Sequence, residues 1–344
     1  MSDTATQQFP GGTDPAHGEA VGQGSTRAPA HYVLRYDATR VRLERIALYA
    51  STVIAVAVPA VAAVDVRFPG RAVLALLFVL VVPGVPLASL LRVRDSLLAS
   101  SLAGGISLAC ALLTSTAALT SGLWSPLGWA VGLAVAHVVA TVAAHIRLRA
   151  VVPSRARPRP RRTGFPWVRV ISLATLVVAI ALWGLAVHWL RLGAAGVTGV
   201  IGVVSWPYVV AALLVAAVAA VNLLRRKLDT LVLTATAVAV TLVIFAFVNV
   251  ASGAASVSTG WLHVGFIRYI SVHQTTFSGL DARADWPGFF AAGAQLVDLA
   301  GVRDASAFLR LAPFVYNVAA LAPLLVITRC VTRSQRLAWL ALFV

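Results

Sequence analysis

Long apolar runs alternate with short polar or basic segments along most of this chain. Several runs reach the roughly 18 to 20 residues that an α-helix needs to cross a bilayer. Because backbone groups in lipid must hydrogen-bond within their own segment, the runs predict helices and exclude open sheets. The pattern therefore predicts an all-α, multi-pass transmembrane bundle of eight or nine spans, with a kink in the second span at residues 83–86 (PGVP). The predicted spans are Leu43–Val64, Ala72–Leu91, Leu97–Leu119, Leu127–Ile146, Val168–Leu190, Pro207–Leu224, Thr230–Ala251 and Ala307–Ile327, and a further span begins near Leu337.

Composition and charge agree with this pattern. The chain is 59% hydrophobic and only 12% charged, whereas about a quarter of the residues of a soluble domain are charged. A net charge of +16 could indicate nucleic-acid binding, but the charge lies mostly in alternate loops. With the N-terminus in the cytoplasm, 21 of the 28 basic residues fall in cytoplasmic segments. This is the positive-inside distribution. It predicts a multi-pass cell-membrane protein in contact with membrane lipid, with a cytoplasmic N-terminus and no nucleic-acid partner.

Two polar segments divide the chain. Residues 1–34 are rich in Gly, Ser, Thr and Pro, which predicts a disordered cytoplasmic tail. Residues 151–166 contain SRARPRPRR, a basic cytoplasmic linker that could touch anionic headgroups. Between them, residues 35–150 form a predicted four-span bundle. Residues 167–344 form a second membrane module with an external loop at 252–306. The chain ends in WLALFV, inside the last predicted span, so we expect the N-terminal part of a longer protein.

Polar chemistry is concentrated in the external loop, at WLHVGFIRYISVHQTTFSGLDARADWPGFF (Trp261–Phe290). Ionisable groups near a bilayer are costly, and they are usually paired or functional. Four of the chain's twelve acidic residues lie between Asp281 and Asp304. GFIRYI (Gly265–Ile270) and PGFFAAGAQLVDLAG (Pro287–Gly301) are typical of short amphipathic helices that lie along a membrane interface.

Asp281 and Asp285 are four residues apart, so they would share a face of a helix. Such a pair can act as a general base or bind a divalent cation such as Mg²⁺ or Mn²⁺. The alternative is a solvated loop in which Arg283 pairs with a neighbouring carboxylate. His263 could reach a phosphate or an acid, or could simply be an interfacial histidine. Arg268 and Arg283 could clamp a lipid-linked phosphate, or merely extend towards water.

Other acidic residues need only structural roles. Asp65 can pair with Arg67 or Arg71 in a short external loop. Asp95 and Asp229 each precede a span, where a carboxylate caps the helix N-terminus. Asp304 could cap the eighth span in the same way. Walker-type loops, GxSxG elbows and HExxH motifs are absent from the sequence.

The order of features over residues 229–344 resembles the first external loop of polytopic GT-C-type glycosyltransferases, particularly bacterial members. The resemblance rests on a span followed by His263 with GFIRYI, then Asp281, then WPGFF, and then GVRDASAFLRLAPFVYN entering the next span. It implies a polyprenyl-phosphate-linked sugar as donor. Asp281 or Asp285 would then be the base or metal ligand. The family's acidic residues usually follow the preceding span closely, whereas here that position reads SGAASVSTGWLH.

These features leave two hypotheses. The first is a GT-C-like glycosyltransferase, with Arg268, Arg283 and His263 near the donor phosphate. The second is a non-enzymatic membrane protein, such as a transporter, a flippase or an assembly subunit. A transporter should carry ionisable residues deep inside several spans and broken helices in paired repeats. An enzyme should collect its polar residues at one membrane face.

Overall fold

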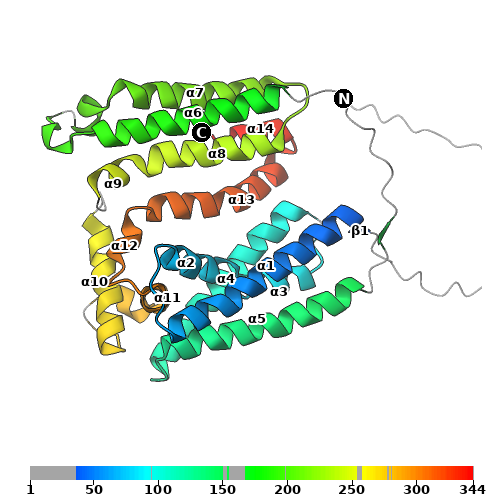
Figure 1. Ribbon diagram of the computed structural model, residues 1–344, viewed down its shortest axis with the longest axis vertical. Helices are drawn as coiled ribbons and strands as arrows, with labels where there is room; N and C mark the ends of the chain where they lie inside the picture. Colours follow the sequence, from blue (N-terminus) through cyan, green and yellow to red (C-terminus); the bar gives the residue numbers. More distant parts are fainter. Residues whose placement is uncertain are drawn as a thin grey trace, which may run out of the picture. The chain divides into compact units, whose positions relative to one another are not determined.

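In the computed structural model, the described residues are 36–93, 95–149, 153–154, 167–197, 199–253, 258–276, 279 and 281–343. Nearly all of them are helical (Figure 1). The only strands among them are β1 (Tyr36–Asp37) and β2 (Pro153–Ser154), which pair in parallel. The predicted tail at 1–34 and nearly all of the predicted linker at 151–166 lie outside the described residues.

The all-α membrane fold is confirmed. Seven helical segments of the described chain are long and apolar enough to cross a membrane. Six of them correspond to the first six predicted spans, and the seventh corresponds to the predicted eighth span. They are formed by α1 (Ala38–Ala63), α2 with α3 (Arg71–Val81 and Gly84–Leu90), α4 (Ser96–Thr120), α5 (Pro126–Arg149), α6 (Trp167–Trp189), α7 (Trp206–Leu224) and α13 (Ala312–Thr332).

The kink predicted at PGVP is present, because α2 ends at Val81 and α3 begins at Gly84. Gly84 lies tightly against α4, where its amide donates a hydrogen bond to Ser107 Oγ over 2.9 Å. A Cβ at this glycine would lie 1.9 Å from the carbonyl oxygen of Ala103, so no other residue fits. The break therefore lets the second span bend while keeping close contact with α4.

Helices α1, α2, α4 and α5, together with the end of α11 (Gly288–Ala300), form a core that contains Phe78 of α2 and Trp129 of α5. Two buried polar side chains in this group of helices lie within hydrogen-bonding distance of each other. His137 Nε2 lies 3.2 Å from Ser51 Oγ, so the histidine links α5 to α1. Ser51 thereby has a partner on α5, whereas Nδ1 of the buried His137 ring has no hydrogen-bond partner among the described residues.

Helices α6 and α7 pack side by side, joined by two short 3₁₀ turns, η1 (Leu192–Ala194) and η2 (Gly199–Val203). The predicted span Thr230–Ala251 is divided into α8 (Thr230–Phe245) and α9 (Phe247–Ser252). Asp229 caps α8, as expected, and also pairs with Arg169 over 2.7 Å. Asp95 likewise caps α4, accepting hydrogen bonds from two backbone amides.

Helix α13 contacts both α4 and α8. It begins at Ala312, five residues after the predicted start at Ala307. A separate short helix, α12 (Ser306–Leu309), comes first, and Asp304 accepts hydrogen bonds from the backbone and side chain of its first residue, Ser306. The prediction that Asp304 caps the eighth span is therefore wrong, since α13 begins after Leu311 without a side-chain cap. After α13 the chain turns into α14 (Gln335–Leu340).

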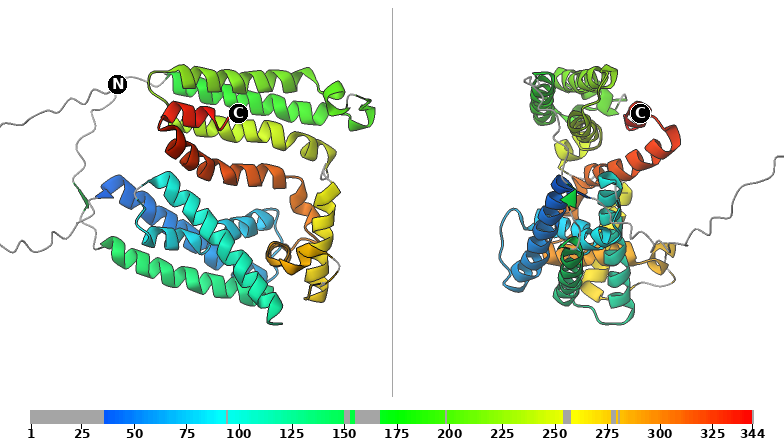
Figure 2. Two further views of the ribbon diagram at one scale, coloured as in Figure 1. Left: turned by 180° about the vertical axis from the view of Figure 1, so that it is seen from behind. Right: turned by 90° about the vertical axis from the view of Figure 1, so that its right-hand side faces the viewer.

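The region predicted as an external loop contains α10 (Ser258–His273), η3 (Ala282–Asp285) and α11 (Gly288–Ala300). Helix α10 runs across the ends of the neighbouring spans, as Figure 1 and the left view of Figure 2 show. Helix α11 packs against α10 and against α2, α4 and α5. Most of its residues are buried, so this helix is covered by protein rather than lying open on the surface.

Candidate functional site

Close packing of α10 against α11 builds the site. Val264, Ile267 and Ile270 of α10 are buried against Phe290 and its neighbours on α11. Gly293 allows the approach, because a Cβ there would lie 2.8 Å from Ile267 Cδ1. This packing fixes the distance between the two helices and places their N-terminal turns beside each other.

An aromatic cluster forms where α10 meets the start of α11. The His263 ring lies 5.5 Å from the Phe290 ring and 6.0 Å from the Phe289 ring. Phe266 packs edge-on against Phe290 at 5.1 Å between ring centroids. The guanidinium carbon of Arg283 lies 5.1 Å from the centroid of the Phe266 ring, within the range of a cation–π contact. The cluster thus joins His263 and Arg283 through phenylalanine rings.

Arg283 also binds Asp281. Its Nε and Nη2 donate hydrogen bonds of 2.8 and 2.6 Å to the two carboxylate oxygens, and its backbone amide donates a third of 2.9 Å. These bonds lower the pKa of Asp281 from 3.8 to about 2, with the Arg283 side chain as the largest cause. Asp281 is therefore ionised at neutral pH and binds a proton weakly. This is the pairing expected in the alternative structural interpretation of this segment.

The other two predicted residues lie apart from this cluster. Asp285 is exposed at the end of η3, and no cation of the described chain pairs with it. Arg268 is exposed on α10. The pKa of Asp304 is lowered first by the hydrogen bonds from Ser306 and further by the charge of Arg268. The structure therefore pairs Asp281 with Arg283 directly and links Arg283 to His263 only through the rings of Phe266 and Phe290. Arg268 lies towards Asp304.

The donor set for a divalent cation is incomplete. Within the part of the chain that the structure describes, no three His, Cys, Asp or Glu side chains gather closely enough to hold a metal ion. Both carboxylate oxygens of Asp281 already accept hydrogen bonds from Arg283. The described residues thus do not fit the predicted Mg²⁺ or Mn²⁺.

Sequence reasoning missed Asp298, in the last turns of α11. Ser271 Oγ of α10 donates a hydrogen bond of 3.2 Å to its Oδ1. Burial raises the pKa of Asp298, and the bond from Ser271 partly offsets this rise. The signal was an acidic residue within an apolar helical stretch, but its burial depends on α10 and could not be read locally.

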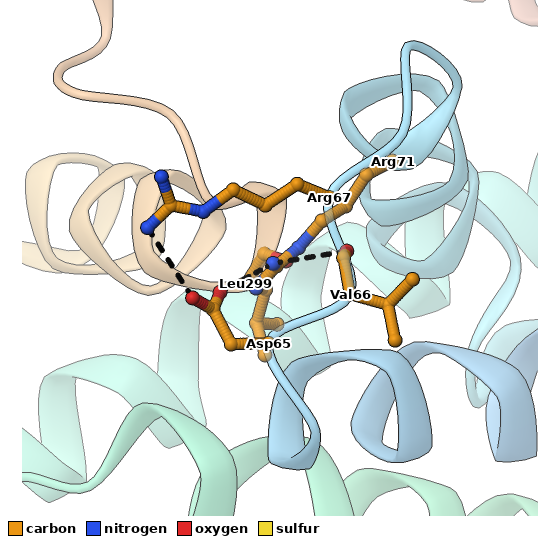
Figure 3. Close-up of polar contacts among 5 residues, drawn as sticks. All are labelled: Asp65, Val66, Arg67, Arg71 and Leu299. Carbon is orange, nitrogen blue, oxygen red and sulfur yellow. Dashed lines mark hydrogen bonds and ion pairs between the residues drawn. The ribbon is translucent and has the colours of Figure 1, made fainter.

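Arg71 is a second residue whose full role was missed (Figure 3). It is only 5% exposed. Its Nη1 donates a 2.7 Å hydrogen bond to Asp65, and its Nε donates a 2.9 Å hydrogen bond to the carbonyl of Leu299. The predicted pairing of Asp65 is confirmed with both candidates, since Arg67 lies 3.3 Å from the other carboxylate oxygen. The α1–α2 connection is thereby tied to the C-terminus of α11.

Gln295 lies fully buried in the middle of α11. Neither its Oε1 nor its Nε2 has a hydrogen-bond partner among the described residues. A buried amide without partners is costly, and the pattern of α11 alone did not reveal it.

Searches of protein-family models, curated proteins and solved structures find no match to this chain. Functional inference therefore rests on the geometry of the residues themselves.

Proposed function

We propose that the protein is a GT-C-like membrane glycosyltransferase that moves a sugar from a polyprenyl-phosphate donor at the membrane face spanned by α10 and α11. The observation that carries the proposal is that His263 and Arg283 both lie against the phenylalanine cluster, with Asp281 bound to Arg283. A cation and a histidine fixed beside apolar rings suit a ligand that is part phosphate and part hydrocarbon.

Arg283 would stabilise the departing phosphate. A guanidinium offers five N–H donors. The two carboxylate bonds to Asp281 use one on Nε and one on Nη2. The Nη1 donors remain, on a side chain that is 41% exposed. Asp281 then positions the arginine, and the arginine stabilises the negative charge that develops on the leaving group.

The proton of the acceptor hydroxyl needs a different group. Asp281 is a poor base, because Arg283 holds its pKa at about 2 and a useful base titrates nearer the working pH. Asp285 lies two residues from Arg283 and is exposed. In this proposal Asp285 accepts the proton, Asp281 orients Arg283, and His263 contacts the donor phosphate.

Replacement of Arg283 in the full chain tests the proposal. We expect Arg283→Gln and Asp285→Asn each to reduce lipid-linked sugar turnover, measured by mass spectrometry of lipid extracts, by at least about a hundredfold. Arg191→Gln is the matched control, since Arg191 is exposed at the α6–α7 connection. Normal sugar turnover in both site variants, at equal protein levels, would remove the enzymatic assignment.

A non-enzymatic membrane protein is the second candidate. The observation favouring it is that Asp281 and Arg283 neutralise each other, while α11 is buried as a brace among α2, α4, α5 and α10. In this case the Arg283→Gln change would reduce protein stability, and lipid-linked sugars would stay unchanged.

A further inference from the structure

The α7–α8 connection and the turn between α13 and α14 lie at the end of the bundle opposite α10 (Figure 1). The α7–α8 connection contributes Arg225, Arg226 and Lys227, and the α13–α14 segment contributes Arg333 and Arg336. We call these five residues the basic patch. Arg336 Nη2 donates a 2.9 Å hydrogen bond to the backbone carbonyl of Arg225, across 111 positions of sequence. Two basic segments that are far apart in sequence are thereby fixed beside each other.

The cations of the basic patch are not neutralised by ion pairs within the described residues. The acidic side chain nearest in sequence, Asp229, is occupied by Arg169 at 2.7 Å. Arg226, Lys227, Arg333 and Arg336 are exposed. Five like charges gathered in this way create a positive potential that attracts an anion from outside the described chain.

Two further hydrogen-bond donors near the basic patch have no acceptor among the described residues. Arg329, one helical turn before Arg333, has a buried Nε with no hydrogen-bond partner in the described residues. Trp339 on α14 is 3% exposed, and its indole N–H likewise lacks a partner there. These two donors are buried, so the groups that can reach a phosphate are the exposed cations of the basic patch.

Exposed apolar side chains lie next to the basic patch in the sequence. Leu224, just before Arg225, is 81% exposed. Val331, between Arg329 and Arg333, is 77% exposed, and Leu337, just after Arg336, is 51% exposed. Cationic side chains next to exposed apolar side chains suit a ligand that has a phosphate at one end and acyl chains at the other. A free phosphate or a nucleotide would leave this hydrocarbon uncovered.

We propose that the basic patch is a binding site for an anionic glycerophospholipid. Its phosphate is bound by the guanidinium groups, and its acyl chains lie along Leu224, Val331 and Leu337. Basic sites between membrane helices are known to hold such headgroups. Unlike general attraction between basic loops and a negative membrane surface, this site predicts a lipid that stays bound after purification. The proposal is independent of any enzymatic activity.

The test compares two double variants with the same loss of charge. Arg226→Gln/Arg333→Gln removes two exposed cations from the basic patch and spares the bond between Arg336 and Arg225. Arg42→Gln/Arg149→Gln removes two exposed arginines, from the start of α1 and the end of α5, which lie at the same end of the bundle in Figure 1. Binding of cardiolipin and of phosphatidylglycerol to the purified full chain is measured by native mass spectrometry, with phosphatidylcholine as the reference lipid.

We expect the patch variant to bind the anionic lipids roughly thirtyfold more weakly, from about one kcal/mol for each arginine lost. The Arg42/Arg149 variant should bind them as the wild type does. Equal losses in the two variants would overturn the proposal, since they would indicate general charge attraction. Equal affinity of the wild type for phosphatidylcholine would overturn it as well.

Two further arms identify the source of the phosphate. Val331→Ser/Leu337→Ser should weaken lipid binding while leaving the cations in place, because the acyl chains lose their contact surface. Inorganic phosphate, added at matched phosphate concentration, should neither displace the lipid nor raise the melting temperature. If inorganic phosphate stabilises the wild type as strongly as the lipid does, the site binds a soluble anion and the proposal is wrong.

Discussion

Arg71 donates a hydrogen bond from its Nε to the backbone carbonyl of Leu299 over 2.9 Å, across 228 positions of sequence. Leu299 lies in the last turn of α11, where carbonyls lack partners within the helix and a cation is favourable. The same guanidinium binds Asp65 and the carbonyl of Val66. One side chain therefore joins the α1–α2 connection to the helix that carries the start of the candidate site.

We expect Arg71→Met to destabilise the protein by about 2 kcal/mol, because it removes charge-assisted hydrogen bonds and strands the Leu299 carbonyl in a buried place. Arg67→Met is the matched control, since the Arg67 side chain is 83% exposed and should change stability little. Unfolding in detergent, followed by thermal scan or by denaturant titration, measures both. Equal stability of the two variants would contradict the bridging role of Arg71.

Gly301 ends α11 with a backbone φ of +63°. A Cβ at this position would lie 2.6 Å from Cζ of Arg71. Gly301→Ala should therefore cost about 1 kcal/mol for the left-handed backbone and further stability for the displaced guanidinium. Adding Arg71→Ala to Gly301→Ala should remove only the second cost, so the two changes should be less than additive. Strict additivity in this double-mutant cycle would show that the contact is not made.

Local chemistry was predictable from the sequence, and long-range burial was not. The apolar runs predicted the spans because a helix in lipid needs only length and hydropathy, and Asp95 and Asp229 predicted their caps from position alone. The pairing of Asp281 with Arg283 was foreseen as an alternative, because the residues are two positions apart. The covering of Asp298 and Gln295 was not foreseen, since it depends on helices from distant parts of the chain.

The break at Ala246 and the late start of α13 have the same origin. Hydropathy treats Thr230–Ala251 as one continuous run, whereas the helix breaks between Phe245 and Phe247. Hydropathy also extends the eighth predicted span back to Ala307, because residues 305–309 are mostly apolar. Asp304 instead starts a separate turn there. Span boundaries thus depend on caps and turns, which an average over a run does not register.

The pKa shift of Asp298 gives a pH-dependent prediction. Burial raises its pKa in the folded protein above the unfolded value of about 3.9. Its favourable contribution is therefore present below that unfolded value and is lost as the pH rises through the folded pKa. The stability of Asp298→Asn minus that of the wild type should therefore be larger at pH 7 than at pH 4. Thermal unfolding of both proteins at the two pH values measures this difference.

Ser271→Ala provides a check on that prediction. The hydroxyl of Ser271 partly lowers the pKa of Asp298, so its loss should raise that pKa further and move the stability loss to higher pH. A pH dependence that is the same in the wild type, Asp298→Asn and Ser271→Ala would show that Asp298 does not titrate in the folded protein at these pH values.

For the Asp281–Arg283 pair, the predicted change of stability with pH has the opposite sign to that for Asp298. The pKa of Asp281 is depressed to about 2, so its contribution is present above the unfolded value and is lost only as the pH falls through about 2. The effect of Asp281→Asn on the free energy of unfolding should therefore stay constant between about pH 5 and about pH 8, because both limits lie above the reference pKa of an aspartate. If thermal unfolding shows an effect of Asp281→Asn that changes within this window, the carboxylate is not bound by Arg283.

Replacing Gln295 by an apolar residue of similar shape should stabilise the protein. Its amide is fully buried in α11, and neither polar atom has a partner in the described chain. Gln295→Met keeps nearly the same shape and removes the desolvated amide, so we expect stability to rise by about 1 kcal/mol. Gln295→Ala, which leaves a cavity, should instead lower stability by about 2 kcal/mol. Loss of stability in the methionine variant, measured by thermal unfolding, would mean that the amide binds a water or another group in the middle of α11.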